Sequence, residues 1–117
     1  MIWDREAKSL KSLVTDEEAY NAAIKDILDI EVLYIDDFLK VRKHSAPTDA
    51  DVKLAFEIIN TRYNDARMTT LLSSELMIDE LLDIDEAVGS RILERAGEYS
   101  LNIGRDRTKN WRLRGAM

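Results

Sequence analysis

The chain has 117 residues, of which 34% are charged and 45% hydrophobic, and its net charge is −6 at pH 7. It has no cysteine and one histidine, which excludes disulfides, thiolate metal sites and clusters of histidine ligands. The acidic balance argues against non-specific nucleic-acid binding by the whole chain, and no apolar run approaches the roughly 20 residues of a membrane span. We therefore expect a cytoplasmic α/β protein that forms one domain, or part of one, over residues 1–117.

Hydrophobic periodicity and turn signals predict alternating helices and strands. Thr15 and Glu18 form a capping box that opens the second helix, and Thr48 with Asp51 caps the third. In chain order we predict helices at 4–13 and 15–28, a strand at 32–35, a helix at 49–65, a strand at 68–73, helices at 77–83 and 86–96, and strands at 99–103 and 110–113. This alternation predicts parallel pairing early in the chain and an antiparallel hairpin at its end.

The apolar run Val32–Ile35 leads directly into two carboxylates, Asp36 and Asp37. Such a run predicts a strand buried on both faces of a parallel sheet, and 68–73 has the same character. Carboxylates at the carboxyl edge of the sheet lie where α/β folds bind ligands, and their oxygens suit Mg²⁺ and a nucleotide phosphate. An ordinary strand-to-loop turn is the alternative. The first glycine is Gly89, so no G-x-x-x-x-G-K-[ST] phosphate loop precedes the strand.

Charged residues are distributed unevenly. Arg91 and Arg95 are four residues apart and share one helix face, where surface pairing with glutamates is the alternative to a functional role. Residues 75–86 hold six acids and no base, whereas 105–114 hold five bases and one acid. These stretches are either separate contact surfaces or solvated faces. The basic loop 40–44 offers cations to DNA phosphates, with a solvated loop as the alternative.

Aromatic residues are predicted to serve packing. Phe56, Ile59 and Tyr63 recur at helical spacing and are expected in the core. Trp3 and Trp111 are expected to pack near the chain ends.

Four segments together point to a known family: Leu33–Phe38, Phe56–Tyr63, Leu71–Glu75 and Gly89–Arg95. They resemble the C-terminal half of the helicase-loader ATPases, the DnaC-like members of the AAA+ superfamily, which are close to the IstB-like transposition helpers. The resemblance covers about residues 10–114 and is strongest to loaders of prophages and mobile elements in Gram-positive bacteria. It implies a partial P-loop fold of three αβα layers, with the N-terminal P-loop strand missing.

The resemblance implies roles for residues at the strand ends. Asp36 would hold Mg²⁺ through water, and Asp37 would orient the attacking water from the Walker B position. At the sensor position near the γ-phosphate we favour Ser74 over Glu75, because a carboxylate facing phosphate is unfavourable.

The resemblance also implies roles for three arginines. Arg91 and Arg95 are candidates for the arginine finger that acts on a neighbouring subunit's nucleotide. Arg112 resembles the second sensor arginine, with a surface position as the alternative. The intact parent would bind ATP, Mg²⁺, single-stranded DNA and the replicative helicase.

The phosphate loop of the family pattern would precede residue 1, and Ile2-Trp3 would be the stump of the following strand. We therefore expect no useful ATP affinity from this chain alone. The strand at 68–73 would expose an apolar edge, which favours self-association or a rearranged hairpin. A fragment of a helicase loader or transposition helper is the leading hypothesis. A non-enzymatic module that joins a full-length loader is the second, and a stand-alone phosphohydrolase, which lacks basic phosphate ligands, is the third.

Overall fold

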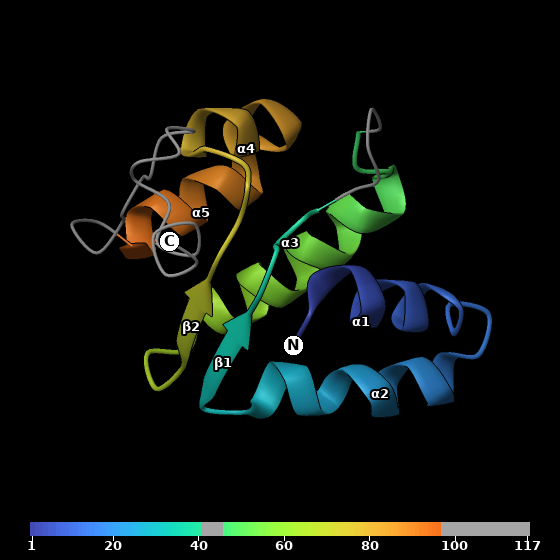
Figure 1. The fold of residues 1–117 in the computed structure, drawn as a ribbon. Helices are drawn as coiled ribbons and strands as arrows, with labels where there is room; N and C mark the ends of the chain where they lie inside the picture. Colours follow the sequence, from blue (N-terminus) through green and yellow to red (C-terminus); the bar gives the residue numbers. More distant parts are fainter. Residues whose placement is uncertain (41–45, 97–117) are drawn as a thin grey trace, which may run out of the picture.

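The computed structural model describes residues 1–40 and 46–96 and confirms an α/β architecture (Figure 1). Its elements are α1 (Trp3–Lys11), α2 (Glu17–Asp29), β1 (Val32–Ile35), α3 (Asp49–Tyr63), β2 (Thr69–Leu72), α4 (Ile78–Ile84) and α5 (Glu86–Ala96). Every helix predicted within this range is present, with ends that differ by at most two residues. The predicted hairpin at 99–113, Trp111 and most of the loop 40–44 lie outside the described residues.

The strands pair in parallel, as predicted. β1 lies beside β2, with Val32 opposite Thr69 and Ile35 opposite Leu72. On the other edge of β1, Ile2 forms an isolated parallel bridge with Asp36. Only Ile2 of the predicted Ile2-Trp3 strand remnant pairs with the sheet, because Trp3 already begins α1.

Two helix starts differ in how well the sequence anticipated them. The capping box of α3 is present, since Thr48 Oγ1 accepts from the Asp51 amide at 3.2 Å and Asp51 Oδ2 accepts from the Thr48 amide at 3.0 Å. The predicted Thr15 cap of α2 is wrong by one residue. Asp16 is the N-cap, and its Oδ1 accepts from the Ala19 amide at 3.1 Å. A carboxylate at this position serves as well as a hydroxyl because it also favours the positive end of the helix dipole.

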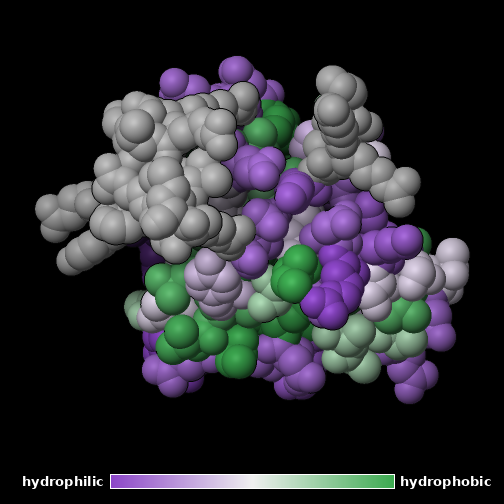
Figure 2. All heavy atoms as spheres, in the orientation of Figure 1, coloured by the Kyte–Doolittle hydropathy of each residue, from purple (hydrophilic) through white to green (hydrophobic). Residues whose placement is uncertain are grey.

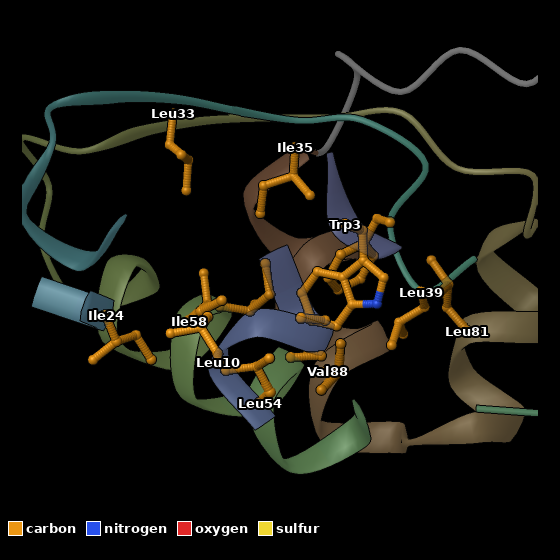
Figure 3. Packing of buried hydrophobic residues seen from close by; sticks show 14 residues of the cluster. Trp3, Leu10, Ile24, Leu33, Ile35, Leu39, Leu54, Ile58, Leu81 and Val88 are labelled. Carbon is orange, nitrogen blue, oxygen red and sulfur yellow. The ribbon is translucent and has the colours of Figure 1, made fainter. Parts of the chain in front are cut away.

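The hydrophobic core lies between the sheet and the helices (Figure 3). Leu33 and Ile35 project from β1 toward this core, and the buried hydrophobic residues of the described chain come from α1 to α5 as well as β1 and the loop after it. Trp3 is 1% exposed and meets the Phe38 ring edge-on, with centroids 5.1 Å apart. The prediction that Trp3 is a packing residue is therefore confirmed.

The prediction that both strands are buried on both faces is wrong. Along β1, Val32 is 57% and Tyr34 49% exposed, and the partly covered positions of β2 alternate in the same way, with Leu71 50% exposed. The described helices cover one face of the sheet, so only the alternate residues that point to that face are removed from water. Within residues 1–40 and 46–96 the fold therefore has two layers rather than three.

Helix α3 buries the aliphatic part of the predicted stripe, which includes Leu54 and Ile58, but not its aromatic members. Phe56 is 37% exposed and Tyr63 is partly exposed, although Ile59 is buried as expected. The buried face of the helix consists of Asp51, Leu54, Ala55, Ile58, Ile59 and Arg62. Arg62, only 2% exposed, replaces the expected aromatic residue at the end of this face. In the described part of the chain, no helix combines the length and apolarity needed to cross a bilayer.

Candidate functional site at the carboxyl edge of the sheet

Asp36 and Asp37 lie at the carboxyl edge of the two parallel strands, as the sequence predicted, and both contact Ser73. The Ser73 hydroxyl donates to Asp36 Oδ1 at 2.6 Å and accepts from the Asp37 amide at 3.1 Å. Both aspartates are partly exposed. The end of β1 thus presents two carboxylates to solvent, with a hydroxyl of the neighbouring strand fixing the position of the first.

The loop that follows β1 contains two strained residues. Asp37 has φ of 57° and Leu39 has φ of 58°, a left-handed conformation that costs an L-residue about 1–2 kcal/mol. The backbone is held there because the Phe38 amide donates to the Ser73 carbonyl at 2.8 Å, and the Phe38 and Leu39 side chains are buried. Non-glycine residues in this conformation cluster at functional sites, which supports a role for this loop beyond a simple turn.

Ser73 and Ser74 have different surroundings. Sequence reasoning favoured Ser74 as the sensor residue, but the Ser74 hydroxyl donates to the Phe38 carbonyl at 2.9 Å and accepts from the Leu76 amide at 3.0 Å. The structure places Ser73, which sequence reasoning missed, on the aspartates. The register of the two strands would have identified Ser73, because Ile35 lies opposite Leu72 and the next residue of each strand must also be adjacent.

A cation of the chain itself lies near the carboxylates. Lys40 Nζ is 3.9 Å from Asp37 Oδ2 and 3.7 Å from Glu75 Oε1. All three side chains are well exposed, so these long contacts stabilise the fold little. These contacts place a positive charge beside Glu75, the residue that was less favoured than Ser74 for the sensor position.

The carboxylates at this edge can hold Mg²⁺ only if another molecule supplies further ligands. In the described ranges no three His, Cys, Asp or Glu side chains are grouped to hold a metal ion. Asp36 and Asp37 therefore provide two carboxylates without a third protein ligand. Mg²⁺ in phosphoryl-transfer sites is typically held by one or two carboxylates, waters and substrate phosphate oxygens. The pair thus suits a Mg²⁺ ion that arrives with a phosphate.

The two arginines of α5 lie against α3. Arg91 Nη1 donates to the Ala87 carbonyl at 3.1 Å, and its guanidinium lies 5.3 Å from the centre of the Phe56 ring. Arg95 donates to the carbonyls of Tyr63 at 2.8 Å and Met68 at 3.2 Å, which ties α5 to the end of α3. The alternative to a functional role was a surface ion pair with a glutamate, and neither arginine forms one with a described residue. No described contact joins either arginine to Asp36. Arg112 lies outside the described residues.

With this geometry in view, comparison with known proteins finds two relatives, both from Bacillus subtilis strain 168. The uncharacterized protein YqaM is 44% identical over 86 residues, which are 72% of this chain and 27% of YqaM. The phage-like element PBSX protein XkdC is 35% identical over 105 residues, which are 88% of this chain and 39% of XkdC. The chain thus spans between about a quarter and two fifths of the length of these relatives. No protein-family profile matches the chain, and no solved structure matches it.

Proposed function

We propose that this chain is the Walker B and sensor part of a DnaC-like helicase-loader ATPase of a phage-derived element. The observation that carries the proposal is the contact of Ser73 with both aspartates at the carboxyl edge of two parallel strands. In P-loop ATPases a magnesium-binding carboxylate and a polar sensor residue come from neighbouring strands at this edge. The name of XkdC, a protein of a phage-like element, fits the resemblance to prophage loaders.

In this proposal each side chain has a chemical task. Asp36, oriented by Ser73, would hold Mg²⁺, and Asp37 would align a water molecule for attack on the γ-phosphate. When bound there, Mg²⁺ would neutralise charge on the phosphates. Ser73 and Ser74 together take the sensor position, the first by fixing Asp36 and the second by fixing the loop. Arg91 or Arg95 acts on the nucleotide of a neighbouring subunit, and Arg112 acts as the second sensor arginine.

The proposed parent binds ATP, single-stranded DNA and the replicative helicase, and forms the three-layer P-loop fold. A phosphate-binding loop supplies most of the affinity for ATP through its backbone amides and lysine. We therefore propose that the present 117 residues do not bind ATP by themselves. Isothermal titration with Mg²⁺-ATP measures this directly, and micromolar affinity would show that the chain is a complete nucleotide site.

A chimera tests the ATPase assignment. The segment of XkdC that matches this chain is replaced by the chain itself, and ATP hydrolysis is measured for XkdC, the chimera and the chimera with Asp37→Asn. We expect hydrolysis by XkdC and by the chimera, and at least a hundredfold loss in the variant with Mg²⁺-ATP binding retained. Absence of hydrolysis in XkdC itself, or full activity of the variant, would contradict the proposal.

A second candidate is a non-enzymatic module that associates with a full-length loader. Lys40 favours it, because an ammonium 3.9 Å from Asp37 competes with a phosphate-bound metal cation for that carboxylate. Pull-down of XkdC by the tagged chain tests this candidate. Stable association without any gain in hydrolysis supports it over the first.

A further inference from the structure

Lys40 belongs to the carboxyl edge of the sheet, although sequence reasoning found no basic phosphate ligand near the aspartates. Its Nζ lies 3.9 Å from Asp37 Oδ2 and 3.7 Å from Glu75 Oε1. These two carboxylates come from the loop after β1 and from the segment after β2, so the ammonium lies where the two strands end. This edge is where open α/β sheets bind their ligands.

A tight turn returns the chain from Asp37 to Lys40. The Lys40 amide donates to the Asp37 carbonyl at 2.9 Å, which closes a four-residue turn through Phe38 and Leu39. The third residue of this turn, Leu39, has φ of 58°, a conformation in which glycine is the usual residue. Leucine is held there because its side chain is only 1% exposed and packs in the core. The position of Lys40 is therefore set by a buried anchor rather than by a solvated loop.

The segment after β2 holds the same turn from its other side. The Phe38 amide donates to the Ser73 carbonyl at 2.8 Å, and the Ser74 hydroxyl donates to the Phe38 carbonyl at 2.9 Å. Glu75 is the next residue of this segment. The hydrogen bonds that fix the turn therefore also bring the backbones of Lys40 and Glu75 together.

The Lys40 ammonium has hydrogen-bonding capacity for another anion. Both of its carboxylate contacts are longer than the roughly 3.2 Å of an N–H···O hydrogen bond, so neither Asp37 nor Glu75 takes up one of its three N–H donors. The side chain is 45% exposed, and Figure 2 shows hydrophilic residues, in purple, beyond the carboxyl ends of the strands. A lysine ammonium in such a position binds phosphate as a compact point charge.

We propose that Lys40 is a ligand of the terminal phosphate of a nucleoside triphosphate. This role of Lys40 rests on the proposed function, which supplies the nucleotide. Asp37 and Glu75 alone would repel a phosphate, whereas an ammonium close to both offsets their charge and offers N–H donors to the phosphate oxygens. The terminal phosphate is the one expected there, since Asp37 is the carboxylate proposed to align the attacking water.

The first test measures nucleotide affinity in the XkdC chimera, with Mg²⁺ present. Fluorescent ADP and a fluorescent non-hydrolysable ATP analogue are titrated separately. Lys40→Gln should weaken binding of the triphosphate analogue by about tenfold or more and leave that of ADP within about twofold, because a charged contact to the terminal phosphate alone is lost. Lys53→Gln is the matched control, since it removes the same charge from an exposed position on α3. It should change neither affinity.

The second test separates a phosphate ligand from a simple balance of charge. The double variant with Lys40→Gln and Glu75→Gln removes one positive and one negative charge, so the net charge of the edge equals that of the wild type. If Lys40 served only to neutralise Glu75, this variant would bind the triphosphate analogue as tightly as the wild type. Removal of a carboxylate does not replace a lost ligand, so we expect the weak binding of Lys40→Gln to persist in the double variant.

Lys40 is exposed, so these variants should fold, and ADP binding reports this in each of them. Tighter binding of the triphosphate analogue by Lys40→Gln would overturn the proposed role, because it would show that Lys40 competes with a metal cation for Asp37. Unchanged binding, equal weakening of both nucleotides, or recovery of wild-type affinity in the double variant would overturn it as well, and the ATPase assignment would stand. Absence of nucleotide binding by XkdC and the chimera would contradict the proposed function together with this role of Lys40.

Discussion

The Arg62 guanidinium donates from Nε to Thr70 Oγ1 at 2.8 Å, inside the protein, and joins the end of α3 to β2. The same side chain has no carboxylate partner among its described hydrogen bonds, and its charge is spread over backbone carbonyls instead. These belong to Ile27, Leu28, Ile30, Glu31 and Thr69, in the last turn of α2, the connection to β1 and the start of β2. Burial lowers the pKa of Arg62, although it stays charged because arginine in proteins does not lose its proton. One buried cation thus satisfies carbonyls of α2, of the α2–β1 connection and of β2.

Replacement of Arg62 should be the most damaging single change in the described fold. Arg62→Ala leaves a group of part-buried carbonyls without this donor, and we expect a loss of about 3–5 kcal/mol in the free energy of unfolding. Arg62→Lys keeps the charge but not the planar fork, so its loss should be smaller. Urea unfolding followed by circular dichroism measures both. A loss below about 1 kcal/mol for the alanine variant would contradict this role.

Substitution of the two serines that follow β2 should change the hydrogen exchange of different backbone amides. Ser73→Ala removes the acceptor of the Asp37 amide, so exchange of that amide should become at least tenfold faster. Ser74→Ala should instead expose the Leu76 amide, which donates to Ser74 Oγ at 3.0 Å, and leave the Asp37 amide protected from exchange. Amide exchange measured by NMR resolves the two sites. Equal effects of both substitutions on Asp37 would mean that Ser73 does not hold this loop.

The accuracy of the fold predicted from the sequence depended on whether the signal was local or involved distant parts of the chain. Local signals served well: Thr48 and Asp51 predicted their capping box, and helical periodicity located α1 to α5. Burial on both faces was wrong because the apolarity of Val32 and Tyr34 is the same whether or not a second helical layer covers them. Only the described three-dimensional arrangement shows which face the helices occupy.

The site was predictable in outline and not in detail. Asp36 and Asp37 lie at the expected edge, because a strand followed by carboxylates fixes their position along the chain. Ser73 was missed because its contact depends on the register of two strands. Arg62 was missed because arginine is rarely buried and its partners are carbonyls, which sequence patterns do not display.

Gly89 should not tolerate even a methyl group. A Cβ at this position would lie 2.9 Å from the backbone N and Cα of Leu82, where α4 and α5 approach each other. Gly89→Ala gains about 1 kcal/mol in helix propensity but forces two backbones apart, which costs about 1–3 kcal/mol or more. We expect net destabilisation in urea, against no loss for the exposed neighbour Ser90→Ala. A stabilised Gly89→Ala would show that the two helices can separate freely.

The Lys11–Asp51 contact should make stability depend on acid. Burial raises the pKa of Asp51, but hydrogen bonds from Lys11 and Thr48 outweigh it and leave the pKa below its usual value of 3.8. A carboxyl group whose pKa is lower in the folded state stabilises the fold at pH values above its unfolded pKa. This stabilisation is lost as the pH falls through the folded pKa. Lys11 Nζ lies 2.6 Å from Asp51 Oδ1.

Lys11→Met provides the comparison. The difference in unfolding free energy between the wild type and this variant should be constant above about pH 5 and shrink below about pH 4. Urea titrations at a series of pH values measure it. A difference that does not change with pH would mean that the lysine acts through its hydrocarbon stem alone.

The contact of Trp3 with Phe38 gives the protein a built-in optical reporter. Phe38 directly follows the two aspartates, and the Trp3 amide also donates to the Asp36 carbonyl at 3.0 Å. The chain has two tryptophans, so Trp111→Phe leaves Trp3 as the sole indole fluorophore. Any ligand that shifts the loop after β1 would change the surroundings of a buried indole ring. Emission from Trp3 can therefore follow events at the carboxyl edge without a dye or a label.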